Sequence, residues 1–466
     1  MMEYINKKLQ QFENALAGKK IAIIGLGVSN LPLLDYFYDK KANITVFNNS
    51  KIDDNVMEKI NNYRYDVETG EGNLSKLKGF DIVFRSPSCL PTIPELQAEK
   101  ENGAIITTEI EQVLKLAPCK VIGITGSEGK TTTTSLIYAI LKKAGINCYL
   151  GGNIGNPLFT SIEKMKPDDI IVLELSSFQL MDMKISPDIS VITNIFPEHL
   201  NVHKSYEEYQ EAKRNIIYYQ NENGISVLNK DNDITKNFDT ATNGKVIFFS
   251  SKEKLYDGYY YDREDGYIKY GVDDKEEKII HSSLIKLRGI HNCENICAAL
   301  AATTTLASRE AQIDAIKEFK GVAHRLEFVK EINGAKYFND SIGTSPASTI
   351  AGLDSFAENI ILLAGGADKN LDYTKIGEKI VEKVGTLILC GPTADKIESA
   401  TRKALEAQNK DIPIIRTNNL KESILEAHKI AKEGDIVLLS PASTSFDAFK
   451  NFEERGNYFK DIVNSL

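Results

Sequence analysis

The chain contains 466 residues, of which 42% are hydrophobic and 26% charged, and its formal net charge is −9. This length predicts about three domains of ordinary size, and the composition is typical of globular proteins. No apolar stretch approaches the roughly 20 residues that a membrane-spanning helix needs, and the acidic balance argues against nucleic acid as a partner.

The N-terminus and the cysteines indicate a cytoplasmic protein. The first residues, Met1 to Lys8, lack the apolar core and the small-residue cleavage site of a signal peptide. The six cysteines are scattered without C-x-x-C spacing, and Cys293 and Cys297 have no second pair with which to bind a metal ion. We therefore expect a reducing cytoplasm and no membrane partner.

The first predicted elements form a βαβ unit. A strand over Lys20–Ile24 is followed by a glycine turn, a helix to about Lys40 and a second strand over Ile44–Phe47. A further strand covers Asp81–Arg85. Parallel strands that end at one crevice are typical of nucleotide-binding folds.

This unit does not match a dinucleotide site. Asn30 occupies the third glycine position of G-x-G-x-x-G, and Asn48 and Asn49 stand where an acid for the ribose diol is expected. The sequence therefore disfavours a dehydrogenase.

Residues 119–134 contain the most informative motif of the chain. Val121–Ile124 reads as a buried strand and Thr131–Ala144 as the helix that follows. Between them, Gly126 and Gly129 allow backbone N–H groups to turn toward phosphate oxygens, where the helix N-terminus adds positive potential. A glycine-rich turn with a solvated lysine is the simpler alternative, but strand, loop and helix in this order favour ATP binding.

Two side chains of this loop suit a nucleoside triphosphate. We expect Lys130 to reach the β- and γ-phosphates and the Thr131 hydroxyl to ligate Mg²⁺. The strict G-x-x-x-x-G-K-[ST] pattern is not met, because Ile124 stands at the position of the first glycine.

The next two predicted strands place further candidate ligands at the same edge of the sheet. Asp169–Leu175 carries Glu174 at its end, and Ile189–Ile195 is followed by His199. Glu174 either faces solvent or binds Mg²⁺; the apolar residues before it and its place beside the loop favour metal. For the same reason of position we expect His199 to be a second metal ligand rather than a structural histidine.

A helix after Ser205 carries one unusual lysine. Ser205 and Glu208 predict a capping box, and Lys213 borders the apolar stripe of that helix. Burial disfavours the charged form of lysine, so Lys213 either meets an anion or extends its amine to solvent.

The remaining chain divides into two parts. After about residue 225 the strands become shorter, and residues 255–281 predict an exposed β excursion whose charges are solvated. Near residue 322 a third block begins with a hairpin at Asn333-Gly334. Parallel strands with helices between them follow at these positions: Ile360–Leu363, Thr386–Cys390, Ile412–Arg416 and Ile436–Leu439.

Four stretches carry a resemblance to a known family. Thr125-Gly-Ser-Glu-Gly-Lys-Thr131, Gly151-Gly-Asn-Ile-Gly155, Leu173-Glu-Leu-Ser-Ser-Phe-Gln-Leu180 and the run from Leu439 to Gly456 resemble the Mur ligases. The resemblance implies an α/β protein of three domains: a UDP-substrate-binding Rossmann-like domain (1–110), a P-loop ATP-binding domain with a small β excursion (111–321) and a Rossmann-like domain that binds the amino acid (322–466).

The resemblance also implies an activity. ATP would phosphorylate the terminal carboxylate of UDP-N-acetylmuramoyl-L-alanine, and the amine of D-glutamate would attack the acyl phosphate, releasing ADP and phosphate. The implied cofactors are ATP and Mg²⁺ at two sites, with Mn²⁺ as an alternative, and a carbamylated Lys213. We expect a monomer that works on small-molecule substrates in the cytoplasm.

Site residues follow from the resemblance position by position. Those implied for catalysis are Lys130, Glu174, His199 and Lys213, and those for metal are Thr131, Glu174, His199 and Lys213. The implied ATP-binding residues are Gly126, Ser127, Glu128, Gly129, Lys130, Thr131, Thr132, Asn292, Asn295, Arg325 and Asp340. The implied substrate-binding residues are Ser29, Asn49, Ser88, Asn153, Ser176, Thr344, Lys369, Ser445 and Phe452. Glu128 departs from the family, which usually has asparagine there, and Ile342 replaces a common lysine.

Two other functions fit parts of the sequence. One is a related ATP-dependent amide ligase, such as another Mur ligase or a folylpolyglutamate-type synthase; residues 439–456 argue against it. The other is a nucleotide-binding switch that hydrolyses ATP without ligating anything. Phosphate release that requires both precursor and D-glutamate would distinguish the ligase from the switch.

Overall fold

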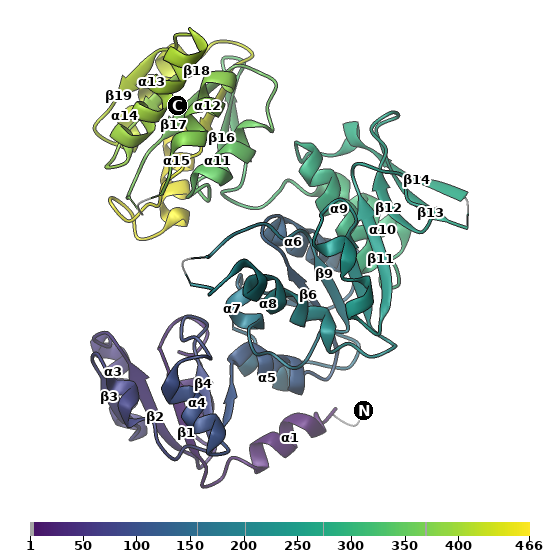
Figure 1. Ribbon diagram of the computed structural model, residues 1–466, viewed down its shortest axis with the longest axis vertical. Coiled ribbons are helices and arrows are strands. Elements are labelled where there is room, and N and C mark those ends of the chain that lie inside the picture. Colours follow the sequence, from purple (N-terminus) through teal and green to yellow (C-terminus); the bar gives the residue numbers. More distant parts are fainter. Residues whose placement is uncertain (1–3, 156, 201, 274, 369–370) are drawn as a thin grey trace. The chain divides into compact units, whose positions relative to one another are not determined.

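The computed structural model describes residues 4–155, 157–200, 202–273, 275–368 and 371–466. They form three β-sheets with helices packed against them (Figure 1). The chain divides into two compact units, Met1–Leu284 with Cys293–Lys317, and Ile285–Asn292 with Glu318–Leu466. The first unit holds the N-terminal and central sheets, and the second holds the C-terminal sheet. The predicted fold class, α/β with three parallel-sheet domains, is confirmed.

The N-terminal sheet has the order β3-β2-β1-β4-β5, and all its strands are parallel. The predicted strand Lys20–Ile24 is confirmed, and its last four residues are buried. The helix expected to reach about Lys40 ends earlier, at Phe37. Its elements are α1 (Lys7–Asn14), β1 (Lys20–Ile24), α2 (Leu33–Phe37), β2 (Asn43–Asn48), α3 (Asp54–Tyr63), β3 (Asp66–Thr69), β4 (Ile82–Arg85), α4 (Pro94–Glu101) and β5 (Ile105–Thr107), followed by α5 (Glu109–Leu116).

The central sheet has the order β14-β13-β12-β11-β10-β9-β6-β8-β7. Strand β6 lies between β8 and β9, so the phosphate loop that follows it is at the middle of the parallel part. The elements are β6 (Lys120–Thr125), α6 (Lys130–Lys143), β7 (Cys148–Gly152), β8 (Ile170–Glu174), α7 (Ser177–Leu180), β9 (Ile189–Ile192), α8 (Tyr206–Tyr218), β10 (Ile225–Asn229), β11 (Lys245–Ser250), β12 (Gly258–Tyr261), β13 (Tyr267–Val272), β14 (Lys275–His281), α9 (Ile290–Thr303) and α10 (Arg309–Glu318).

The predicted excursion over residues 255–281 belongs to this sheet. Strand β12 pairs in parallel with β11, and β13 and β14 continue the sheet as antiparallel strands. Its charges are not all solvated as expected. Lys269 is only 5% exposed and forms ion pairs with Asp262, Asp265 and Glu276. A buried ammonium group needs such partners, which the sequence pattern alone did not reveal.

The C-terminal sheet has the order β15-β16-β20-β17-β18-β19. The hairpin predicted at Asn333-Gly334 joins β15 and β16, and every other pair in the sheet is parallel. Its elements are β15 (Glu327–Ile332), β16 (Ala335–Asn339), α11 (Pro346–Leu353), β17 (Ile360–Ala364), α12 (Thr374–Lys383), β18 (Val384–Leu389), α13 (Ala394–Gln408), β19 (Ile414–Arg416), α14 (Leu420–Ile430), β20 (Ile436–Leu439) and α15 (Phe452–Ser465).

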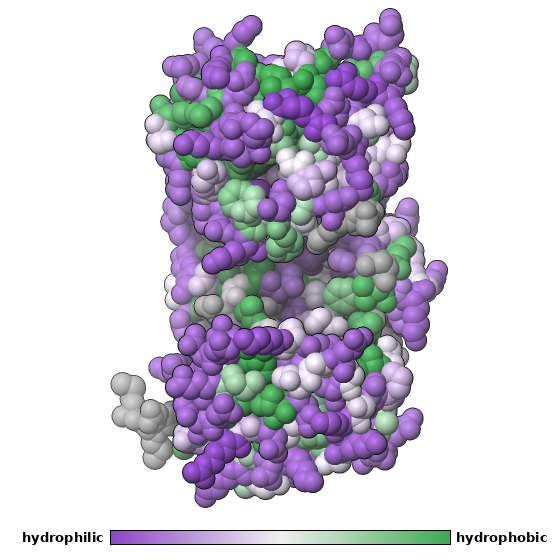
Figure 2. Space-filling view, turned by 90° about the vertical axis from the view of Figure 1, so that its left-hand side faces the viewer, coloured by the Kyte–Doolittle hydropathy of each residue, from purple (hydrophilic) through white to green (hydrophobic). Residues whose placement is uncertain are grey.

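The face shown in Figure 2 is mostly hydrophilic, with hydrophobic residues in separate groups. Within the part of the chain that the structure describes, no helix has both the length and the apolar character needed to cross a membrane. Short 3₁₀ turns complete the fold at Asn73–Lys76, Phe159–Lys164, Thr235–Asn237, Asp239–Ala241 and Ser282–Leu284.

Candidate active site

The phosphate loop connects β6 to α6 in a conformation that requires glycine. Gly126 has φ +149°, and a Cβ there would lie 1.9 Å from the Thr193 hydroxyl oxygen. Gly129, the N-cap of α6, has φ +78°, and a Cβ there would lie 2.3 Å from Oδ1 of Asn295. Backbone N–H groups at such a strand–loop–helix turn are suited to bind phosphate oxygens.

Two lysines converge on one carbonyl oxygen of this loop. Nζ of Lys130 donates to the Gly126 oxygen at 2.8 Å and to the Ser127 oxygen at 2.6 Å. Nζ of Lys213, on α8, donates to the same Gly126 oxygen at 2.6 Å. Lys213 is 2% exposed and Lys130 is partly exposed, so the two amine groups are close together on one side of the loop.

The surroundings of Lys213 disfavour its charged form. Burial, and then the charge of Lys130, hold the pKa of Lys213 well below its usual value. Its Nζ also lies 4.8 Å from the centre of the Tyr209 ring. The bordering lysine of the sequence is therefore a buried residue, and the alternative in which its amine extends to solvent is wrong.

Glu174 ends β8 and keeps one carboxylate oxygen without a partner. Its Oε1 accepts a hydrogen bond from Nδ2 of Asn153 at 2.9 Å. Its Oε2 is buried and has no hydrogen-bond partner. An orphaned buried carboxylate oxygen costs free energy unless a cation or donor binds there, so this end of β8 fits a divalent metal ion. Among the described residues, no group of three or more His, Cys, Asp or Glu side chains is arranged to hold a metal by itself.

One pocket of about 540 Å³ gathers many of the residues expected from the sequence. It lies within the first unit, at the carboxyl ends of strands in the N-terminal and central sheets. The expected residues that line it are Ser88, Lys130, Asn153, Ser176, His199 and Lys213. The sequence did not single out the other lining residues, which are Pro87, Leu90, Ser177, Phe178, Glu198, Val202 and Tyr209.

The first turn of α7 shapes one wall of this pocket. Ser176 caps the helix and forms a full capping box with Gln179. The box expected at Ser205 is only half formed: the Ser205 hydroxyl accepts from Glu208 N, but the Glu208 carboxylate accepts from Lys204 N instead of Ser205 N.

Two histidines contact Phe178 beside the pocket. His199, which has φ +55°, meets the ring edge-on with centroids 5.2 Å apart, and His203 stacks on it at the same distance. His203 is buried, and its Nε2 lies 2.9 Å from the Ser177 hydroxyl.

Arg85 is a buried residue that the sequence did not reveal. Located at the end of β4, it donates to the backbone oxygens of Cys89, Phe178 and Met181. Phe178 lies in α7 and Met181 directly follows it, between strands β8 and β9 of the central sheet. Arg85 therefore connects the N-terminal sheet to the α7 wall of the pocket. Only tertiary structure brings these partners together, so no local sequence signal could have identified it.

The other N-terminal candidates lie at one sheet edge. Ser29 follows β1, Asn49 follows β2 and Ser88 follows β4, and these three strands are neighbours. Ser88 lines the pocket, whereas Asn49 is exposed and the preceding Asn48 accepts from Leu26 N.

The remaining loop candidates surround the start of α6. Ser127 is hydrogen-bonded to the Tyr209 hydroxyl at 2.8 Å, and Glu128 is exposed. Thr132 is buried, and Thr131 is partly exposed at the helix start. Asn295 accepts from the Thr133 hydroxyl, so this residue of α9 contacts the loop. Asn292 belongs to the second unit and donates to the Arg288 oxygen.

Arg325 and Asp340 both belong to the second unit, and the residue after Arg325 contacts Asp340. Asp340 follows β16, and its carboxylate accepts from the Ser440 hydroxyl at 2.7 Å and from the N–H of Leu326, next to Arg325. Burial raises the pKa of Asp340 to about 6, although Ser440 and the Arg325 charge act in the opposite direction.

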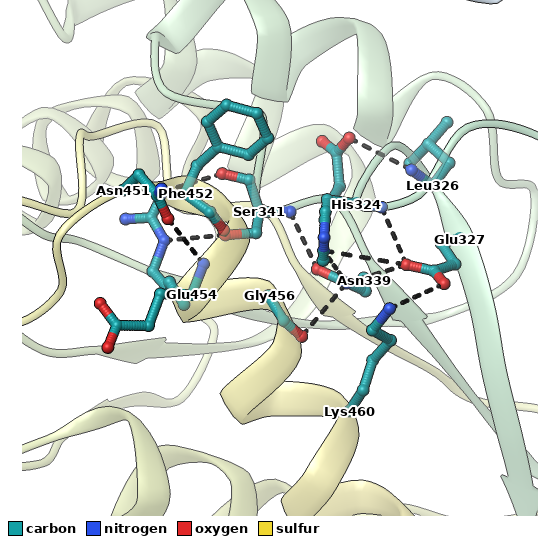
Figure 3. Close-up of polar contacts among 12 residues, drawn as sticks. His324, Leu326, Glu327, Asn339, Ser341, Asn451, Phe452, Glu454, Gly456 and Lys460 are labelled. Atoms are coloured by element: carbon teal, nitrogen blue, oxygen red, sulfur yellow. Dashed lines mark hydrogen bonds and ion pairs between the residues drawn. The ribbon is translucent and has the colours of Figure 1, made fainter. Parts of the chain in front are cut away.

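The residues expected to bind the acceptor lie at the ends of neighbouring segments of this unit. Ser445 is buried in the loop after β20, and Phe452 is the first residue of α15. The Phe452 oxygen accepts from the Ser341 hydroxyl at 2.7 Å, as Figure 3 shows. Thr344 is partly buried between β16 and α11. Lys369, also expected here, lies outside the described residues.

These features define a class of protein. A parallel sheet with a glycine loop, two lysines that share one loop carbonyl and an acid on the adjacent strand is the arrangement of a nucleotide-binding α/β enzyme. The pocket beside the loop leaves room for a second substrate.

Comparison with known proteins identifies the family. Three family models match: "Mur ligase MurD-like, N-terminal domain" over residues 19–108, "Mur ligase middle domain" over 124–303, and "Mur ligase, glutamate ligase domain" over 324–443. The chain is 46% identical over 465 residues to a UDP-N-acetylmuramoylalanine–D-glutamate ligase from Clostridium tetani, and 47% identical over 468 residues to one from Acetivibrio thermocellus. Each alignment covers 99% of this chain and 100% of the relative.

Solved structures agree on the fold. The chain is similar to the UDP-N-acetylmuramate-alanine ligase MurC from Thermotoga maritima, with a TM-score of 0.57, 16% identity and coverage of 96% of this chain and 99% of that one. It is also similar to MurF from Acinetobacter baumannii, with a TM-score of 0.58, 14% identity and 99% of both chains covered. The chain belongs to the Mur ligase family.

Proposed function

We propose that this chain joins D-glutamate to UDP-N-acetylmuramoyl-L-alanine at the expense of ATP, in the cytoplasmic synthesis of peptidoglycan precursor. Two observations support the proposal together. The relatives that carry the D-glutamate ligase name are similar over the full chain. Lys130, Asn153, Ser176 and His199 also line one pocket at the phosphate loop, which supports a role for them in bringing a triphosphate and a carboxylate together.

The reaction has two balanced steps. A carboxylate oxygen of the precursor attacks the γ-phosphorus of ATP, so the bond to ADP breaks and an acyl phosphate forms. The amine of D-glutamate then attacks the carbonyl carbon, loses a proton and expels inorganic phosphate. Carboxylate alone is a poor acyl donor because its leaving group would be oxide, and phosphorylation provides a better one.

The protein's contribution is mainly alignment and charge neutralisation. Lys130 and the loop residues Gly126, Ser127, Glu128, Gly129, Thr131 and Thr132 would bind the triphosphate. In this structure the N–H groups of Ser127 and Glu128 donate to the backbone and side-chain oxygens of Asn194, so these two N–H groups would exchange that acceptor for a phosphate oxygen. Thr131, Glu174, His199 and the carbamylated Lys213 would hold Mg²⁺ at two positions, with Mn²⁺ as an alternative. A divalent ion there supplies neutralisation of the phosphoryl and carboxylate charges.

Carbamylation of Lys213 has a physical reason in the loop. Both Lys213 and Lys130 donate to the Gly126 oxygen, and burial lowers the pKa of Lys213, so its amine is more often neutral. A neutral amine can attack CO₂ and lose a proton to give an N-carboxylate. That change replaces a repelled cation with an anion beside Lys130 and the metal position.

The other expected residues complete the proposal. Ser29, Asn49, Ser88, Asn153 and Ser176 would bind the UDP precursor; Asn292, Asn295, Arg325 and Asp340 would contact ATP; and Thr344, Lys369, Ser445 and the Phe452 amide would bind D-glutamate. We also propose domain boundaries at 1–110, 111–321 and 322–466, a monomer, and the cytoplasm as location.

A coupled assay of ADP release tests the function. The purified chain is given ATP, Mg²⁺, the precursor and one acceptor from D-glutamate, L-glutamate, L-alanine, lysine and diaminopimelate. Of these acceptors, we expect only D-glutamate to support turnover. When the precursor carboxylate is labelled with ¹⁸O, we expect the label in the released phosphate. Equal turnover with another acceptor would indicate a different amide ligase, and ADP release without precursor or acceptor would indicate a nucleotide switch.

A further inference from the structure

A guanidinium group is buried in the first turn of α15. Arg455 is 3% exposed, and its three nitrogens donate to two other segments, one 114 residues and one 12 residues away in the sequence. Nε donates to the Ser341 hydroxyl at 3.0 Å, Nη2 to the Ser341 backbone oxygen at 2.8 Å and Nη1 to the Ser443 backbone oxygen at 3.0 Å. The Ser341 hydroxyl in turn donates to the backbone oxygen of Phe452, the first residue of α15 (Figure 3), so Ser341 contacts the same helix that carries Arg455.

Each segment that Arg455 holds carries a residue of the proposed site. Ser341 directly follows Asp340, a proposed ATP contact. Ser443 is two residues before Ser445, and Phe452 begins the helix on which Arg455 lies. Ser445 and Phe452 are proposed to bind the acceptor. One rigid side chain therefore sets the spacing between the end of β16, the loop after β20 and the start of α15.

A second polar contact fastens the same helix turn. Nδ2 of Asn339 lies 2.9 Å from Nδ1 of His324 and 3.3 Å from the Gly456 oxygen, and in Figure 3 these residues point toward one another. A Cβ on Gly456 would lie 2.2 Å from the His324 ring, so only glycine allows this approach. The turn that carries Arg325 is thus packed against the residue next to Arg455.

The charge of Arg455 is not needed for an ion pair. Within the described residues, no carboxylate oxygen forms an ion pair with it, and all its observed acceptors are backbone oxygens and a hydroxyl. Burial lowers the pKa of Arg455 to about 10, although the charges of Asp447 and Asp340 act in the opposite direction, so the group is still charged at neutral pH. A buried cation without a paired anion is costly, and α15 already packs through Phe459 and Val463. Packing alone therefore does not account for an arginine here.

We propose that Arg455 is a positioning residue for the acceptor amino acid. This role rests on the proposed function and goes beyond it. The guanidinium touches no reacting atom, but it holds Ser445 and the Phe452 amide at the separation that the side-chain carboxylate of the acceptor requires. Its planar fork serves the Ser341 and Ser443 oxygens at the same time. The compact ammonium group of a lysine cannot reproduce that geometry.

Steady-state kinetics of three variants test this role. Arg455→Met removes the fork and keeps the apolar stem, Arg455→Lys keeps the charge only, and Arg416→Met is the matched control. Arg416 is an arginine of the same unit that is paired on the surface with Asp395 and Glu398. The KM values for D-glutamate, ATP and the UDP precursor are measured separately, together with kcat and the melting temperature.

We expect both Arg455 variants to raise the KM for D-glutamate by about tenfold or more, which corresponds to about 1.4 kcal/mol. The KM for the UDP precursor is expected to stay within about twofold, because its proposed contacts lie in the other unit. Arg416→Met is expected to leave all three KM values unchanged. A fourth variant, Arg455→Ala, is expected to regain acceptor affinity when guanidinium ion is added below denaturing concentrations.

Several outcomes would overturn the role. An Arg455→Lys enzyme with wild-type KM values would mean that a point charge suffices. A uniform loss of kcat with a lowered melting temperature and unchanged KM for D-glutamate would mean a purely structural arginine. If the wild-type chain itself does not ligate D-glutamate, the proposed function fails first. Isothermal titration of D-glutamate into wild type and Arg455→Met then still reports whether the pocket exists.

Discussion

Glu109 provides a quantitative test of how the first unit is held together. It begins α5, and its Oε1 accepts from the N–H groups of Leu158 and Phe159 at 2.9 and 2.8 Å. Phe159 in turn packs against Tyr36 of α2 and Phe84 of β4, in the N-terminal part of the unit. The Glu109 carboxyl group therefore lies under the contact between the N-terminal and central sheets, on which the pocket depends.

Burial raises the pKa of Glu109 from 4.5 to about 7, although the two N–H groups act in the opposite direction. Because the folded-state pKa is higher than the unfolded one, the stabilisation is fully present below pH 4.5 and is lost as the pH rises through 7. By linkage, the contribution of Glu109 to the free energy of unfolding falls by about 2.5 kcal/mol between pH 5 and pH 8. Glutamine retains the accepting oxygen but carries no charge to bury, so Glu109→Gln avoids this loss.

Melting temperatures at pH 5, 6, 7 and 8 check the reasoning. We expect the variant to exceed wild type by an amount that grows with pH and reaches a few degrees at pH 8, at about 2 °C per kcal/mol for a unit of this size. Glu101→Gln, at an exposed position of α4, is the control and should show a constant difference. A difference between Glu109→Gln and wild type that does not change with pH, or that falls as the pH rises, would refute the argument.

Three further predictions concern the phosphate loop and its metal position. Lys130→Ala is expected to lower kcat by about a thousandfold or more, because phosphate charge is no longer neutralised; near-normal turnover would exclude that role. Lys213→Ala is expected to lose activity that short carboxylic acids partly restore; absence of rescue, together with no CO₂ adduct on the wild-type lysine by mass spectrometry, would leave the carbamate without support. Glu174→Gln is expected to raise the Mg²⁺ concentration needed for half-maximal rate by about tenfold or more, since it removes the charge of a proposed metal ligand; an unchanged Mg²⁺ titration would place the metal elsewhere.

Much of the fold could be predicted because its strands are continuous buried runs. The strand at Lys20–Ile24 and the hairpin at Asn333-Gly334 were visible from apolar residues and turn chemistry alone. The end of α2 was placed too late, since no residue near Lys40 marks where the helix stops. The sheet membership of residues 255–281 was missed because pairing with β11 depends on tertiary contacts and leaves no local pattern.

The candidate site divides in the same way. The positions of Lys130 and Glu174 at the ends of β6 and β8 could be predicted, because each lies within a few residues of its strand, and their roles stay predictions. Arg85 and Arg455 could not be predicted, because their acceptors at Phe178 and Ser341 are 93 and 114 residues away. A motif can report chemistry that is local in sequence, whereas residues that hold separate segments in register become visible only in the folded chain.

The buried charges of the two units follow one rule. The Oε2 of Glu174 and the guanidinium of Arg455 are both costly to bury without an ion pair; Glu174 ends β8, and Arg455 lies in the first turn of α15. In the first case a buried oxygen has no hydrogen-bond partner and is proposed to bind a metal ion; in the second the cation donates to the backbone oxygens of Ser341 and Ser443. The first kind of charge is expected to affect metal and phosphate binding, and the second the affinity for the acceptor. Because Glu174 and Arg455 lie in different units, we expect the free-energy effect of changing both residues to equal the sum of the two single effects.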